Sequence, residues 1–429
     1  MNSLLGSLRW RRGIPAPKHA PKSRSAVRLP GVDNGLRFSE WILIGLLCLA
    51  YLLSISQPLF GIQLHRTILN HFPLILLLPA LVFHLLSIAF NPRPAARVDI
   101  VSICWPLTVL AVYALLGSLA ARFLFKVSDS YLSFGFYLIL LPVWAAVAPT
   151  RPERVASWVR ALVTIWLLFA LMALAGEVVR ANSRETLHEI EYLVLSGFFV
   201  ALCVARSMGV KLAMLLLMLA AAALNQKLTG YIVAAMAVLH LLVISGRRTN
   251  WKPGYTALAI LISITVAGVL AILYFAFRDY LPSGNPDVRL KQYEAAWRTF
   301  LDSPVWGQAY LKGSGEDYIE SARRLSLPTH SDVLDILKHG GAIGLLLFTL
   351  GYWKIFALLN RAIAATRSDR LLNGYFVGVR FFQVSALVTF AINPLLLKGP
   401  FLIVIWGNLG LATGLALTVM RRPPDPSPA

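Results

Sequence analysis

The sequence predicts an all-α membrane protein, a polytopic bundle of about 12 transmembrane helices with one large, partly helical loop between the ninth and tenth helices. Of its 429 residues, 57% are hydrophobic and only 14% are charged. A soluble domain of this size needs more charge to cover its surface. The apolar residues also fall into runs of about twenty, which as helix span a hydrocarbon core of about 30 Å. These runs are Leu-rich and do not alternate, which excludes a transmembrane barrel.

The apolar runs give the expected order of the spans. They lie near 41–62, 71–90, 100–122, 131–149, 157–176, 191–205, 210–225, 230–246, 254–277, 341–360, 371–393 and 400–420. The chain therefore divides into a basic tail at 1–40, nine helices in 41–277, an outer loop at 278–340, three helices in 341–420 and a short tail at 421–429.

The basic residues set the predicted orientation. Most of the formal charge of +20 falls in the tail at 1–40 and in every second loop. Cytoplasmic loops carry such an excess of Lys and Arg, so both termini are predicted to be cytoplasmic. The tail has no apolar stretch before Trp41, so we expect a basic arm held near anionic headgroups and no cleaved signal peptide.

Two classes of function are disfavoured by composition. The positive charge is distributed by loop and not along one face, so we predict no nucleic-acid partner. The three cysteines, Cys48, Cys104 and Cys203, lie in apolar runs without metal-ligand spacing and read as core residues.

The loop at 278–340 has internal structure. Asp287 is a predicted N-cap of an amphipathic helix that Pro304 ends. Apolar residues recur along this helix at three- and four-residue steps, at Leu290, Tyr293, Trp297, Phe300 and Leu301. A second short helix is expected over 316–327, and Thr329 or Ser331 is expected to cap a third, which re-enters the bilayer at Gly340 and Gly341. Long loops of this kind are usually functional.

The loop carries two motifs. They are Arg289–x3–Tyr293–x3–Trp297–x6–Pro304–Val305–Trp306–Gly307 and His330–Ser331–x2–Leu334–x2–Leu337, followed by Gly341 and Gly344. These motifs resemble the O-antigen ligase and O-antigen polymerase superfamily. Members of that superfamily join lipid-linked glycans at the periplasmic face and have about a dozen spans with one large late periplasmic loop. The resemblance implies that 278–340 is a periplasmic catalytic loop in a bacterial inner-membrane protein.

The resemblance also implies roles for named residues. His330 is the expected catalytic base and Arg289 the expected cation beside the diphosphate of an undecaprenyl-diphosphate-linked glycan. Lys227 and Arg380 are further diphosphate candidates, and Tyr293, Trp297 and Trp306 offer faces for sugar rings, as do Tyr310 and Tyr318. A histidine has a suitable pKa range for this task, and free N–H groups at a helix start favour phosphate.

Two positions depart from the family pattern. Ser331 stands where the family usually has asparagine after the histidine. The family tends to carry an arginine at the outer end of a middle span, where this chain reads NQKLTGYIVAAM with Lys227 as the nearest cation. A lysine cannot grip phosphate bidentately as an arginine does.

Each candidate also has a structural interpretation. A histidine is more often structural than catalytic, and His65, His71, His84, His188, His240 and His339 are interpreted in that way. Arg289 fits a solvated helix charge and Lys227 a snorkelling interface lysine. Arg380 lies near mid-span and could pair with Glu177 for packing alone. The loop aromatics fit a hydrophobic core as well as a sugar platform.

No cofactor is predicted. No Asp-x-Asp motif lies in an outer loop and no His, Cys and acid cluster has metal-ligand spacing. We therefore predict metal-independent chemistry, with inversion at the anomeric carbon by analogy with a single displacement.

Several functions remain open. A polymerase of exopolysaccharide or O-antigen repeat units is favoured over a ligase to lipid A-core, because His-Ser-Asp at 330–332 is more similar to exopolysaccharide polymerases. A transporter or flippase is the alternative from another class, although polar residues gather in one loop and the two halves do not match. A peptidoglycan polymerase shares the layout but not its signatures. Expected partners are the lipid-linked glycan, the bilayer, and flippase and chain-length regulator proteins.

Overall fold

The computed structural model describes residues 40–49 except 46, 52, 82, 94–126, 131–148, 152–180, 191–225, 230, 232–238, 286–312, 319–320, 325–326, 329, 331–392, 395–396 and 399–421. The basic tail at 1–39, most of the predicted first span, and the predicted spans at 71–90 and 254–277 lie almost wholly outside these residues, apart from Val82.

The all-α polytopic bundle that the sequence predicts is confirmed. Among the described residues, five helices are long and apolar enough to cross a membrane. The helices are α3 (Pro94–Leu124), α4 (Leu132–Ile139), α5 (Leu141–Val147), α6 (Pro152–Arg180), α7 (Glu191–Val204), α8 (Met208–Asn225), α11 (Pro286–Asp302), α12 (Asp332–Ala365), α13 (Arg370–Ile392) and α14 (Gly399–Met420).

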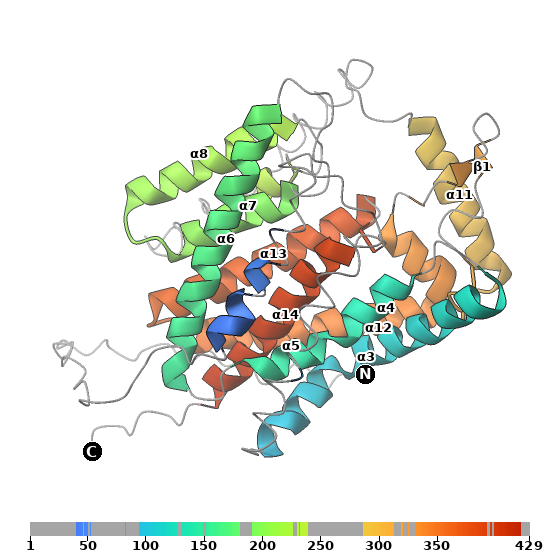
Figure 1. Ribbon diagram of the computed structural model, residues 1–429, viewed down its shortest axis with the longest axis horizontal. Coiled ribbons are helices and arrows are strands. Elements are labelled where there is room, and N and C mark those ends of the chain that lie inside the picture. The colour runs from blue at the N-terminus through green and yellow to red at the C-terminus, as the bar shows by residue number, and fades with distance from the viewer. Residues whose placement is uncertain are drawn as a thin grey trace, which may run out of the picture. The chain divides into compact units, whose positions relative to one another are not determined.

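Helix α14 lies at the centre of the packing. It contacts α3, α4, α5, α6, α12 and α13, and Figure 1 shows it between α13 and α5. Within its candidate span at Leu402–Met420, 94% of an 18-residue apolar stretch is buried inside the protein. Close approach to α5 depends on glycine, because a Cβ at Gly410 would lie 2.5 Å from the Cβ of Trp144. Small residues at helix interfaces in membranes allow such approach.

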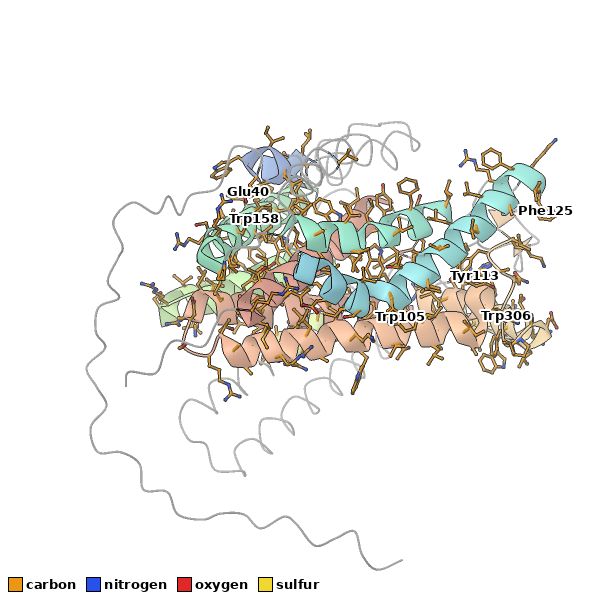
Figure 2. The ribbon with its side chains drawn as sticks, turned by 90° about the horizontal axis from the view of Figure 1, so that it is seen from below. Glu40, Trp105, Tyr113, Phe125, Trp158 and Trp306 are labelled. Carbon is orange, nitrogen blue, oxygen red and sulfur yellow. The ribbon has the colours of Figure 1, made fainter. Side chains whose placement is uncertain are left out.

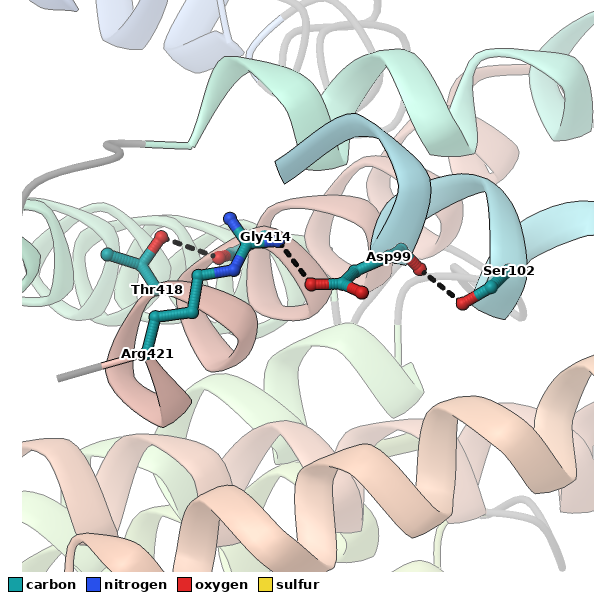
Figure 3. Close-up of polar contacts among 5 residues, drawn as sticks. All are labelled: Asp99, Ser102, Gly414, Thr418 and Arg421. Atoms are coloured by element: carbon teal, nitrogen blue, oxygen red, sulfur yellow. Dashed lines mark hydrogen bonds and ion pairs between the residues drawn. The ribbon is translucent and has the colours of Figure 1, made fainter. Parts of the chain in front are cut away.

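The ends of the helices are joined by ion pairs on one side of the bundle. Arg154 donates from both guanidinium nitrogens to the carboxylate of Glu40, at 2.7 and 2.5 Å. Arg421 at the end of α14 lies 2.5 Å from Asp99 near the start of α3 (Figure 3). Each pair joins helix ends that the predicted topology places on the same membrane face, so the contacts agree with the predicted alternation of spans.

The predicted span at 131–149 is broken in two. Helix α4 ends at Ile139, Leu140 separates the helices, and α5 begins at Leu141 with Pro142 in its first turn. Proline has no N–H to continue the hydrogen bonding of α4 and is well suited to a first helical turn.

Two predictions inside the outer loop were wrong. Residues 316–327 were expected to form a helix, but β1 (Ile319–Glu320) pairs antiparallel with β2 (Leu325–Ser326). A segment this short fits both periods, so its apolar spacing does not decide between helix and strand. Asp287 was expected to precede α11 as its N-cap, but it lies within the helix, which begins at Pro286. Proline is favoured at the first helical position.

Candidate functional site

The start of α12 and the turn that follows α11 form one packed unit, which we call the junction (residues 303–311 and 329–344). Main-chain hydrogen bonds hold it together. The N–H of Gln308 donates to the carbonyl of Lys338 at 3.0 Å, and the N–H of Ala342 donates to the carbonyl of Pro304 at 2.9 Å. The turn is therefore fixed to α12 along both sides of the Gly341 kink.

Two glycines allow this close packing. Gly307 and Gly341 both have φ of +64°, and Gly341 has ψ of −168°. A Cβ on Gly307 would lie 2.5 Å from the N of Gly341, and a Cβ on Gly341 would lie 2.5 Å from the N of Gly307. Other residues adopt such backbone conformations only under strain. The glycines thus let two backbones meet where α12 bends.

Ser331 caps α12, and it is one of the two residues, Thr329 and Ser331, that the sequence predicts for this role. Ser331 is extended, and its side chain accepts a hydrogen bond from the N–H of Leu334 at 3.4 Å. The two acidic residues of the first turn, Asp332 and Asp335, complement the positive end of the helix.

The first two turns of α12 bury four ionisable side chains, which we call the charge cluster (Asp332, Asp335, Lys338 and His339). None is more than 1% exposed. The Nζ of Lys338 lies 3.8 Å from Oδ1 of Asp335. Steps of three residues place Asp332, Asp335 and Lys338 on one side of the helix. Buried charges are costly, so such a concentration is typical of functional sites.

Asp332 links the cluster to the segment between α13 and α14. Its carboxylate accepts hydrogen bonds from the N–H of Leu395 at 2.7 Å and of Leu396 at 3.1 Å. Two successive N–H groups directed at one carboxylate are a typical anion-binding arrangement of main chain.

Aromatic rings surround His339. The ring of Tyr131 lies 4.6 Å from it, and the ring of Tyr310 stacks on it at 5.6 Å with an interplanar angle of 21°. Tyr310 is itself fully buried. The turn therefore contributes an aromatic side to the charge cluster.

Of the predicted site residues, Arg289 and Tyr293 lie together in α11. Arg289 is half-buried in the first turn of the helix. The pKa of the Tyr293 phenol is raised above its ordinary value by burial, and the nearby Arg289 guanidinium offsets part of this rise. Trp297 and Trp306 are 48% and 60% exposed, so among the described residues neither is a core residue.

One predicted site residue lies away from the junction, and two lie outside the described residues. Arg380 donates from Nη1 to Oδ1 of Asn360 at 2.7 Å, near the other end of α12. The structure therefore does not bring Arg380 together with Trp306 and Tyr293. His330 and Lys227 lie outside the described residues, although the neighbours of His330, Thr329 and Ser331, are both buried.

Sequence reasoning missed most of the charge cluster. His339 was interpreted as structural, and Asp335 and Lys338 were assigned no role. The signal was present in the three-residue steps of DVLDILKHGG, which combine two acids and a lysine on one helix side. Within the described residues, no group of three or more His, Cys, Asp or Glu side chains could hold a metal ion.

Residues 213–349 match the family model described as O-antigen ligase. Over this segment, the match supports the O-antigen ligase and polymerase superfamily that the loop motifs resemble. The O-antigen ligase segment begins within α8, contains α11 and the whole junction, and ends within α12. It includes Lys227, Arg289 and His330 but not Arg380. No curated protein matches the chain.

Proposed function

We propose that the protein is a membrane glycosyltransferase that joins undecaprenyl-diphosphate-linked oligosaccharides and polymerises repeat units of an exopolysaccharide or O-antigen. One observation carries the proposal: the O-antigen ligase match at 213–349 covers the segment whose turn and helix start pack into the junction. The preference for a polymerase over a ligase rests on His-Ser-Asp at 330–332 and on family analogy.

The reaction is a displacement at the anomeric carbon of the donor sugar. An acceptor hydroxyl oxygen forms the new bond to that carbon, and the bond from the carbon to the diphosphate oxygen breaks with its electron pair on the leaving diphosphate. His330 takes the hydroxyl proton, a role worth roughly 10²–10⁴-fold in rate. Arg289 stabilises the negative charge that develops on the leaving diphosphate.

The junction supports these roles through rigidity. Residues that hold a reacting group in place raise the rate by keeping reactants in the productive geometry. The neighbours of His330 in the sequence are both buried, and one of them, Ser331, caps α12. The charge cluster on the next two turns then acts as the support of the catalytic residue.

The test uses the purified protein in vesicles with a defined lipid-linked oligosaccharide, and the product is sized on a gel. His330→Ala and Arg289→Ala should each reduce product by about 10²-fold or more. Lys291→Ala is the matched control, because Lys291 is an exposed cation two residues from Arg289. Wild-type product from His330→Ala would contradict the proposed catalytic role.

Ligase activity is the alternative, and a null mutant in cells separates the two. Loss of long chains while single units remain attached to the acceptor supports a polymerase. Long chains retained on the lipid carrier support a ligase.

Metal independence and sidedness are further parts of the proposal. Product formation in EDTA should equal that in Mg²⁺, and restoration by metal after loss in EDTA would contradict it. In an inner-membrane protein of the predicted orientation, a thiol reagent added from the periplasmic side should label the cysteine of Lys291→Cys.

A further inference from the structure

We propose that the turn at 304–311, called here the re-entrant turn, lies within the bilayer, and that the side chains of Val305 and Trp306 face lipid acyl chains. The depth of the turn is measured along the axis of α3. Residues 99–124 of α3 form a candidate span. Its exposed apolar residues recur at three- and four-residue steps along the whole span, at Val101, Trp105, Val109, Val112, Leu116, Leu119 and Phe123. Such a stripe is typical of a lipid-facing helix side.

Residues typical of the membrane interface, near the two ends of α3, mark the two membrane boundaries. At one end, the Nζ of Lys354 lies 5.6 Å from the ring of Trp105, and tryptophan and lysine are typical of the interface. At the other end, α3 finishes at Leu124 between the basic residues Arg122 and Lys126. Trp105 and Leu124 are 19 residues apart, or about 29 Å along a helix. This length equals that of a hydrocarbon core of about 30 Å.

The re-entrant turn attaches to α3 between these boundaries. The hydroxyl of Tyr113 donates to the carbonyl of Trp306 at 2.7 Å, and a Cβ on Gly117 would overlap the carbonyl of Ala309. Tyr113 is about 12 Å and Gly117 about 18 Å beyond Trp105 along the helix axis. Figure 2 shows Trp105, Tyr113 and Phe125 in order along α3, with Trp306 on the Phe125 side of Trp105.

Helix α12 gives the same depth when it is measured from the same boundary. The N–H of Ala342 donates to the carbonyl of Pro304, and the N–H of Ile343 donates to the carbonyl of Val305. Ala342 is 12 residues from Lys354, which is about 18 Å along a helix. Because Lys354 marks one boundary, the distances along α3 and along α12 both place the turn inside the hydrocarbon core.

Main-chain pairing makes this depth possible. Irregular backbone is tolerated at membrane depth only where protein satisfies its polar groups. The carbonyls of Pro304, Val305 and Trp306 and the N–H groups of Gly307 and Gln308 all have protein partners. The turn therefore presents its apolar side chains outward and keeps these main-chain groups paired.

The exposed side chains match the lipid-facing stripe. Val305 is 51% and Trp306 60% exposed, against 63% for Leu116 on α3 at similar depth. Acyl chains are the occupant we assign, because this apolar surface continues the stripe of α3. Trp306 then contacts lipid, in place of the sugar platform predicted from sequence.

The experiment measures depth with a nitroxide label in the full-length protein, reconstituted in lipid vesicles, with Cys48, Cys104 and Cys203 replaced by Ala. The label is placed in turn at Trp306→Cys and Val305→Cys. Leu116→Cys is the lipid-facing control and Lys291→Cys, on the exposed charged side of α11, is the aqueous control. Collision with oxygen, which dissolves in acyl chains, is compared with collision with a water-soluble nickel chelate.

We expect Trp306→Cys and Val305→Cys to give an oxygen-to-nickel ratio close to that of Leu116→Cys and at least about tenfold above that of Lys291→Cys, since the core excludes water. A ratio like that of Lys291→Cys would overturn the proposal, as would a label that neither reagent reaches. No product is formed in this measurement, so its outcome is independent of the proposed glycosyltransferase activity. Val305→Cys provides the reading if Trp306→Cys does not fold.

Discussion

The two ends of α12 handle charge in opposite ways. At its start, Asp335, Lys338 and His339 are no more than 1% exposed. Toward its other end, Lys354 is half-buried and Arg361 is exposed. Lys354 donates to the carbonyl of Ser102 at 2.8 Å and lies over the Trp105 ring.

The difference comes from what covers each end. The turn at 303–311 and the rings around His339 cover the first two turns of α12. Lys354, in contrast, makes an exposed hydrogen bond to the carbonyl of Ser102 on α3. A long helix can therefore combine a conventional interfacial end with an end whose ionisable side chains are buried. The buried end is expensive in free energy and is where the chemistry is proposed.

Removal of one cation from each end of α12 should give the largest difference in stability between the two ends. Lys338→Ala should destabilise the protein by about 3–5 kcal/mol, because it leaves the buried Asp335 carboxylate without its nearest ammonium. Lys354→Ala should cost no more than about 1.5 kcal/mol, because its hydrogen bond is exposed. The unfolding midpoint of the purified protein in detergent measures both. Equal losses would remove the distinction between the two ends.

The bend at the buried end gives the next largest effect. Gly341→Ala should cost at least about 1–3 kcal/mol from its backbone conformation alone. The new Cβ would also overlap the carbonyl of Val305. Gly344→Ala is the control three residues away, where the nearest atom would be 3.4 Å distant. Thermal unfolding should show loss for the first and none for the second; a tolerated Gly341→Ala would contradict the tight junction.

Asp332→Ala tests whether the cluster extends to the neighbouring segment. Loss of both hydrogen bonds leaves two buried N–H groups without this partner and should cost about 1–3 kcal/mol. Amide hydrogen exchange should rise at Leu395 and Leu396, whose N–H groups the carboxylate accepts. Asp332→Asn should recover part of the protection. Unchanged exchange in Asp332→Ala would mean that these N–H groups have another partner.

The smallest effect is expected on α11, where charge is in contact with solvent. Arg298 and Glu294 form an i,i+4 pair whose side chains are 75% and 57% exposed. Arg298→Ala should change stability by no more than about 0.5 kcal/mol. Salt should reduce even this difference. A loss as large as that of Lys338→Ala would show that the exposed pair is covered in the membrane.

Much of the fold follows from hydrophobic runs alone. The predicted spans near 100–122, 371–393 and 400–420 correspond to α3, α13 and α14 within a few residues at most ends. Span length and apolar composition are local properties, so one sequence is sufficient for them. The break at Leu140 and the β1–β2 pair depend on local competition between nearly equal alternatives.

The candidate site was less predictable, because its burial depends on distant segments. Asp335 and Lys338 are charged, and hydropathy places such residues at a surface. Their coverage comes from the turn at 303–311 and from Tyr131, far away in the sequence. The side-by-side placement of Arg380 and Asn360 is likewise a product of helix packing. The cap of α12 is a local feature, and Ser331 was one of the two residues predicted for it.

The burial of α14 has a consequence for how the protein is made. This helix leaves the ribosome after every other described helix, yet it occupies the middle of them, with 94% of its apolar window enclosed by protein. The helices around α14 therefore cannot complete their packing until α14 has been synthesised and has entered the space between them. We therefore expect α14 to enter the centre of the bundle late, after the other described helices have been inserted.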